Sequence, residues 1–80
     1  MSLRYPTLAR IPTTKDNEHI REQLVPGSEV LVVQMEDGSE REFPLPNGAS
    51  SYELQVVGVA VIGKFFSSNG DQIPDSEFSV

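Results

Sequence analysis

The sequence predicts a small α+β domain, with three to five mostly antiparallel strands and one short helix. Two observations predict the strands: residues 29–36 are rich in β-branched side chains, and residues 52–66 carry a long valine-rich pattern. The helix is predicted by Ile20 and Leu24, which repeat at helical spacing. We expect residues 1–80 to form a single domain, because 80 residues lie within the size of one folding unit.

The N-terminal third contains the first extended segment and the helix. Residues 5–11 mix apolar side chains with Pro6, which predicts an edge strand or an extended arm, because proline cannot donate to a strand ladder. The helix is expected over residues 13–24, because threonines can cap its start and the residue before Pro26 is pushed out of the helical region. Two or three turns are unstable alone, so we expect this helix to dock on a sheet.

A hairpin is predicted around Asp37-Gly38, with strands over residues 29–36 and 39–45. Counting outward from a two-residue turn places Val32 opposite Phe43. The predicted core face carries Val30, Val32, Phe43 and Leu45, and the second face carries Leu31, Val33 and Met35 opposite Glu40 and Glu42. Two interpretations of the second face stay open: the helix or a loop covers it, or it is a contact surface for a partner.

Residues 52–66 form the most apolar segment of the chain. Their side chains first alternate in polarity, but over residues 56–62 both faces are apolar. A strand that is apolar on both faces must be covered on both, and one short helix cannot do this alone. The segment therefore predicts a contact surface, with Gly58 and Gly63 marking bends, bulges or close approaches of another backbone.

The C-terminal residues 67–80 are polar and acidic. Asn69-Gly70 predicts a turn within them. Two alternatives remain for the rest: Ile73 and Phe78 anchor a last short strand, or the segment is a mobile tail.

The charge and composition restrict the partners that we expect. Twelve acidic residues against six basic ones give a net charge of −6, so we do not expect nucleic acid as a partner, because phosphate binding relies on Lys and Arg. No apolar run approaches the roughly 20 residues that cross a bilayer, and we expect no membrane association. The absence of cysteine fits a reducing compartment, and the predicted location is cytoplasmic.

We expect no enzyme activity, no cofactor and no metal. A hydrolytic triad needs a base, but the single histidine, His19, is predicted to be a surface residue of the helix. One histidine without cysteine does not make a nitrogen and sulfur metal site. The acidic residues between 69 and 77 lack the spacing of a calcium-binding loop, and nothing indicates that Glu40 or Glu42 has the buried setting that acid–base catalysis requires.

One stretch resembles the AbrB-type swapped-hairpin family. It runs Ile20-Arg21-Glu22-Gln23-Leu24-Val25-Pro26-Gly27-Ser28-Glu29-Val30, is preceded by Arg10-Ile11-Pro12 and ends in Glu36-Asp37-Gly38. The resemblance implies an intertwined dimer that serves as a DNA-binding regulator or an antitoxin. It covers less than half of the chain.

A second stretch resembles the β-rich self-cleavage domain of LexA-type repressors. It runs Pro26-Gly27-Ser28-Glu29-Val30-Leu31-Val32-Val33, then Asp37-Gly38, then Val56-Val57-Gly58-Val59-Ala60-Val61. That family uses a serine and a lysine, whereas Arg41 lies near the lysine position here and no serine motif precedes it. Since arginine stays protonated, the resemblance implies an inert domain that keeps only the dimerising role.

The main functional prediction is a non-enzymatic module that associates with itself or with a protein partner. Its expected contact residues are Leu31, Val33, Met35, Val57, Val59 and Val61. The alternative is an AbrB-like transcriptional regulator or antitoxin. A second alternative is a small ligand-binding domain with a pocket near Tyr52 or Lys64.

Overall fold

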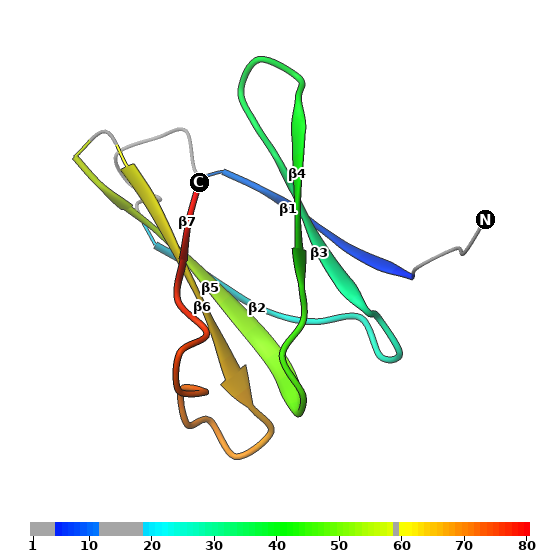
Figure 1. Cartoon of the computed structure of the whole chain (residues 1–80). Coiled ribbons are helices and arrows are strands. Elements are labelled where there is room, and N and C mark those ends of the chain that lie inside the picture. The colour runs from blue at the N-terminus through cyan, green and yellow to red at the C-terminus, as the bar shows by residue number, and fades with distance from the viewer. Residues whose placement is uncertain (1–4, 12–18, 59) are drawn as a thin grey trace.

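The computed structural model describes residues 5–11, 19–58 and 60–80. These residues form two β-sheets and contain no helix (Figure 1). The three-stranded sheet A has the order β1 (Pro6–Arg10), β3 (Val30–Gln34), β4 (Glu40–Pro44). The four-stranded sheet B has the order β2 (His19–Gln23), β5 (Ala49–Val57), β6 (Ala60–Ser67), β7 (Phe78–Ser79).

The predicted helix is wrong where the structure describes it, and the fold is all-β instead of α+β. Residues 19–23 form β2, which pairs antiparallel with β5 and places Ile20 opposite Leu54. A spacing of four residues puts two side chains on one face of a helix, but it does the same in a strand, where every second residue shares a face. Pairing with β5 decided between these structures. The predicted helix start at residues 13–18 lies outside the described residues.

The first segment is an edge strand, the first of the two predicted alternatives. β1 pairs with the central strand β3 in parallel, with Thr7 beside Leu31, because the chain passes through sheet B as β2 before it returns as β3. Thr7 is only 3% exposed, and its Oγ1 accepts a hydrogen bond of 3.0 Å from the backbone N–H of Val25. This bond connects β1 to the segment that leaves β2.

The β3–β4 hairpin forms around Asp37-Gly38, but its register differs from the predicted one. Met35 N–H donates to the Ser39 carbonyl at 2.8 Å, so the loop holds three residues instead of two, with Gly38 at a φ of +91°. The shift by one residue places Phe43 opposite Leu31 instead of Val32. A slip of one residue exchanges the two faces of a strand.

The core lies between the sheets and contains Leu31 and Val33, each 0% exposed, which the predicted register had put on the second face. The full buried cluster combines both sheets: Ala9, Leu24, Leu31, Val33, Tyr52, Leu54, Val61 and Phe65. Val30 and Val32, predicted as core, are also buried, but they lie outside this cluster. They alternate with Leu31 and Val33 along β3, so their side chains point to the opposite face of sheet A.

Residues 52–66 form two strands and not one. Val56 pairs with Val61 and Val57 with Ala60, so the chain reverses after Val57, and Gly58 has a φ of +62°. As two strands of one hairpin, β5 and β6 can place their apolar side chains on a common face of the sheet. The expectation of a single strand that must be covered on both faces therefore no longer applies.

The last residues form a short strand, the first of the two predicted alternatives. β7 pairs with β6 and places Phe78 opposite Gly63. The Phe78 ring stacks on Phe43 with centroids 4.2 Å apart and contacts Phe65 at 5.2 Å. These three aromatic rings connect β4 of sheet A with β6 and β7 of sheet B.

Candidate functional site

The six predicted contact residues occupy different environments. Leu31 and Val33 are fully buried within the chain, and Val61 is 8% exposed. Val57 is 49% exposed at the end of β5, and Met35 is partly exposed. The remaining residue, Val59, lies outside the described residues. The structure therefore does not gather the five described residues into one surface, and the side chains of Leu31 and Val33 already belong to the core.

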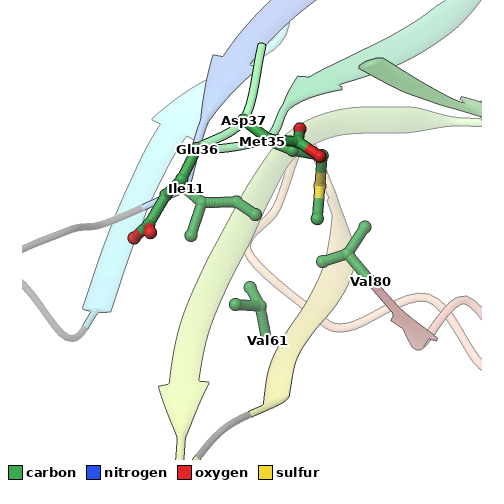
Figure 2. A pocket seen from close by; sticks show the side chains of 6 residues that line it. All are labelled: Ile11, Met35, Glu36, Asp37, Val61 and Val80. Carbon is green, nitrogen blue, oxygen red and sulfur yellow. The ribbon is translucent and has the colours of Figure 1, made fainter. Parts of the chain in front are cut away.

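Met35 and Val61 are brought together at an opening between the sheets. They line a hollow of about 370 Å³ with Ile11 and Val80. Figure 2 shows these four apolar side chains around one space, with Glu36 and Asp37 also lining it. Asp37 is held in place by Ser39, whose N–H and hydroxyl both donate to its Oδ1, at 2.9 and 2.6 Å. These hydrogen bonds lower the pKa of the exposed Asp37 carboxyl, so the hollow has an apolar wall and an acidic rim.

The outer edge of β1 is the most accessible apolar strand edge among the described residues. Leu8, at its centre, is 60% exposed, and Tyr5 just before the strand is 53% exposed. Two backbone groups at the ends of β1 point toward the β3 side. The Tyr5 carbonyl accepts from Glu29 N–H at 2.7 Å, and Ile11 N–H donates to the Gln34 carbonyl at 3.4 Å. Because these orientations alternate along a strand, the N–H and C=O of Leu8 point away from β3.

The other sheet edges are protected by charge, by proline or by shortness. The opposite edge of sheet A, β4, carries Glu40, Arg41, Glu42 and Pro44. In sheet B, β2 carries His19, Arg21 and Glu22, and β7 has only two residues. Natural proteins use these devices to prevent unwanted pairing of edge strands. β1 carries Pro6 and Arg10 at its ends, but its three central residues are uncharged, so the centre of this edge is less protected.

The exposure of Leu8 was missed by the sequence analysis. The apolar residues and the proline of residues 5–11 predict an edge strand or an extended arm, but they do not reveal which side chains face the core. Pairing with β3 puts Thr7 and Ala9 on the inner face, at 3% and 4% exposure, and leaves Leu8 outside.

A second hollow lies between the edges of the two sheets, next to Tyr52. It measures about 370 Å³ and includes Leu8, Ile20 and Glu22 in its wall. Burial raises the pKa of Tyr52 to about 12, and the negative charge of nearby Glu22 adds to this effect. A phenol with this pKa stays neutral at physiological pH, so Tyr52 offers a hydrogen-bonding hydroxyl and no nucleophile.

The outer face of sheet B, which turns away from sheet A, carries an ordered row of charges. Cross-strand neighbours place Glu53 between Arg21 and Lys64. Glu53 does not pair with either of them but with His19, whose Nε2 lies 2.7 Å from its Oε2. The guanidinium of Arg21 instead lies over the ring of Phe66, 4.0 Å from its centroid. His19 is thus a surface residue, on a strand and not on the predicted helix.

Comparison of the chain with protein-family models, curated proteins and solved structures finds no significant match. The two family resemblances therefore stay predictions. In the part of the chain that the structure describes, no group of three or more His, Cys, Asp or Glu side chains is placed to hold a metal ion. The described residues also include no helix with the length and apolar character needed to cross a bilayer.

Proposed function

We propose that the chain is a self-associating interaction module whose contact is the outer edge of β1. The observation that carries this proposal is Leu8, which is 60% exposed at the centre of an edge strand whose three central residues are uncharged. Open edge strands present unpaired N–H and C=O groups, and adding a strand to such an edge is a common mode of protein recognition.

A second copy of this chain fits the edge in an antiparallel arrangement centred on Leu8. A two-fold axis at Leu8 pairs it with the partner's Leu8 and pairs Arg10 with the partner's Pro6. Leu8 and the partner's Leu8 then exchange two hydrogen bonds. Arg10 N–H donates to the carbonyl of the partner's Pro6. Because proline has no N–H to return the bond, the Arg10 carbonyl is the one group per chain that this pairing leaves without a donor.

The same arrangement places the exposed Tyr5 opposite the partner's Ile11. Ile11 lines the apolar hollow with Met35 and Val61, and Tyr5 is 53% exposed in one copy. Two-fold symmetry forms this contact twice, once at each end of the paired strands. Tyrosine is favoured at protein interfaces because its ring buries a large area while its hydroxyl stays hydrated.

Sedimentation analysis of the full chain over a range of concentrations tests this proposal. We expect a concentration-dependent increase from 8.8 kDa toward twice that mass. Leu8→Lys should keep the chain monomeric, because a charge on the edge opposes pairing. Val57→Lys is the matched control, since Val57 is also exposed and apolar but lies at the end of β5.

The outcomes separate the two surfaces. A wild-type chain that stays monomeric at high concentration overturns the proposal. So does a dimer that Val57→Lys dissociates and Leu8→Lys does not, because the contact then lies at the β5–β6 hairpin. Circular dichroism of both variants checks that each is folded.

A further inference from the structure

A polar hollow on sheet B has the composition of an oxyanion site. It measures about 270 Å³ and lies where β2, β5 and the segment after β6 meet. Apart from Glu22 and Gly70, its lining is formed by Arg21, Gln23, Ser50, Ser51, Ser67 and Ser68. The chain as a whole has a net charge of −6, so a hollow built around one arginine and four serines differs from the average surface.

Arg21 is oriented at this hollow by Phe66. Its guanidinium stacks 4.0 Å above the ring centroid, and Phe66 itself is only 9% exposed. Stacking uses the flat face of the guanidinium and leaves its N–H groups, which lie in the plane, available as donors. The carboxylate next to it in the sheet, Glu53, pairs with His19, and no described carboxylate forms a salt bridge with Arg21.

Two irregularities of sheet B bring the serines next to Arg21. A register shift between Ala49 and Ser51 leaves Ser50 as an extra residue in β5. After β6, Ser67 N–H donates to the Asp71 carbonyl at 2.8 Å, and Gly70 N–H donates to the Ser67 carbonyl at 3.0 Å, which folds Ser68 into a tight turn. Both features are local departures from a regular ladder at the edge of the same hollow.

The hydroxyl donors are not all in use. The single proton of the Ser67 hydroxyl is already used within its turn, where it is shared between Asn69 Oδ1 and the Asp71 carbonyl. The hydroxyls of Ser50, Ser51 and Ser68 make no hydrogen bond to the described part of the protein, so they can donate to a ligand. An arginine fork with several hydroxyl donors suits a tetrahedral group with several oxygens better than a carboxylate with two.

We propose that this hollow binds a phosphate group, supplied either as inorganic phosphate or as a phosphorylated side chain of a partner. Glu22, the one acidic residue of the lining, pairs with Tyr52 in the sheet and alternates with Arg21 along β2, so its carboxylate lies beside Tyr52 on the other face of sheet B. The proposal does not depend on pairing at β1, because none of the residues that line the hollow belongs to β1.

Titration of the full chain, followed by backbone amide NMR at constant ionic strength, tests the proposal with three probes: inorganic phosphate, phosphoserine and acetate. We expect phosphate to saturate with shifts at Arg21, Ser51 and Ser68. Arg21→Gln should weaken binding about tenfold or more, the usual cost of a hydrogen bond to a charged group. Arg41→Gln removes the same charge from the exposed strand β4 and should change little.

Two further arms make the outcome decisive. Glu22→Gln, whose side chain lies on the other face of sheet B, should change phosphate binding far less than Arg21→Gln. Tighter binding of phosphoserine than of inorganic phosphate identifies a phosphorylated partner as the source. The proposal is overturned if acetate shifts the same amides with equal affinity, if Arg21→Gln and Arg41→Gln weaken binding equally, or if no amide shift saturates. Spectral dispersion of each variant confirms that it is folded.

Discussion

The ring of Phe78 lies directly on Gly63, its partner in the β6–β7 pair, in space that any other residue would fill with a Cβ. Gly63 has no positive φ, so its importance comes from this close approach and not from backbone conformation. The missing side chain lets the Phe78 ring stack on Phe43 and contact Phe65. One glycine thereby permits the aromatic contact between the two sheets.

Gly63→Ala should destabilise the fold by about 1–3 kcal/mol, the usual cost of overpacking a core. Urea unfolding measures the change. In a Phe78→Ala background the same substitution should cost much less, because the clashing ring is gone. Equal costs in the two backgrounds would show that the contact between Gly63 and Phe78 does not limit the packing.

Thr7→Val should cost about 1–2 kcal/mol, because the substitution keeps the shape but removes the acceptor for Val25 N–H. Amide hydrogen exchange at Val25 should become faster. Thr7→Ser keeps the hydroxyl and is the control, so it should leave the exchange of Val25 slow. If Thr7→Val leaves this exchange unchanged, the bond does not hold β1 to the β2–β3 connection.

The stability of the chain should fall at high pH because of Tyr52. Burial raises the pKa of Tyr52 to about 12 in the folded state, so folding favours the neutral phenol. This contribution is complete below the unfolded pKa of about 10 and is lost as the pH rises through about 12. The unfolding free energy of the wild type should therefore fall relative to that of Tyr52→Phe in that window. A constant difference between them would contradict the shift.

Ser39→Ala should raise the pKa of Asp37, because the Ser39 hydroxyl is the main cause of its lowering. The remaining bond from Ser39 N–H should keep part of the effect. Since hydrogen bonds favour the ionised carboxyl, their contribution is present above its ordinary pKa and is lost as the pH falls through the lowered value. Carboxyl NMR titration measures this pKa. Ser79→Ala, in β7, is the control that should not move it.

Self-association should become stronger as salt is added. Each copy carries a net charge of −6, so two copies repel one another at long range. The Debye length falls from about 30 Å at 0.01 M to about 10 Å at 0.1 M ionic strength, which screens this repulsion. Sedimentation at the two ionic strengths measures the dissociation constant. Weaker association at higher salt would indicate a contact built on ion pairs instead of the uncharged centre of β1.

Residues 19–24 were predicted to be helical from their local pattern, but residues 19–23 form the strand β2. Ile20 and Leu24 share a face in a helix and in a strand alike, and nothing nearby in sequence distinguishes the two. The distinction came from β5, about thirty residues further along the chain, which pairs with β2. The hairpin at Asp37-Gly38 was predicted because its turn chemistry is local. Its register was not, because a three-residue loop shifts every pair by one.

The candidate sites also depend on contacts that local sequence does not reveal. The exposure of Leu8 and the contact of Arg21 with Phe66 arise from pairing between segments far apart in sequence. By itself the sequence determined the β-rich character and the site of one hairpin, because turn residues and alternating polarity act over a few neighbours. It left the first and last segments with two alternatives each. Only the tertiary structure decided strand partners, register and which faces stay exposed, because these depend on which distant segments bury each other.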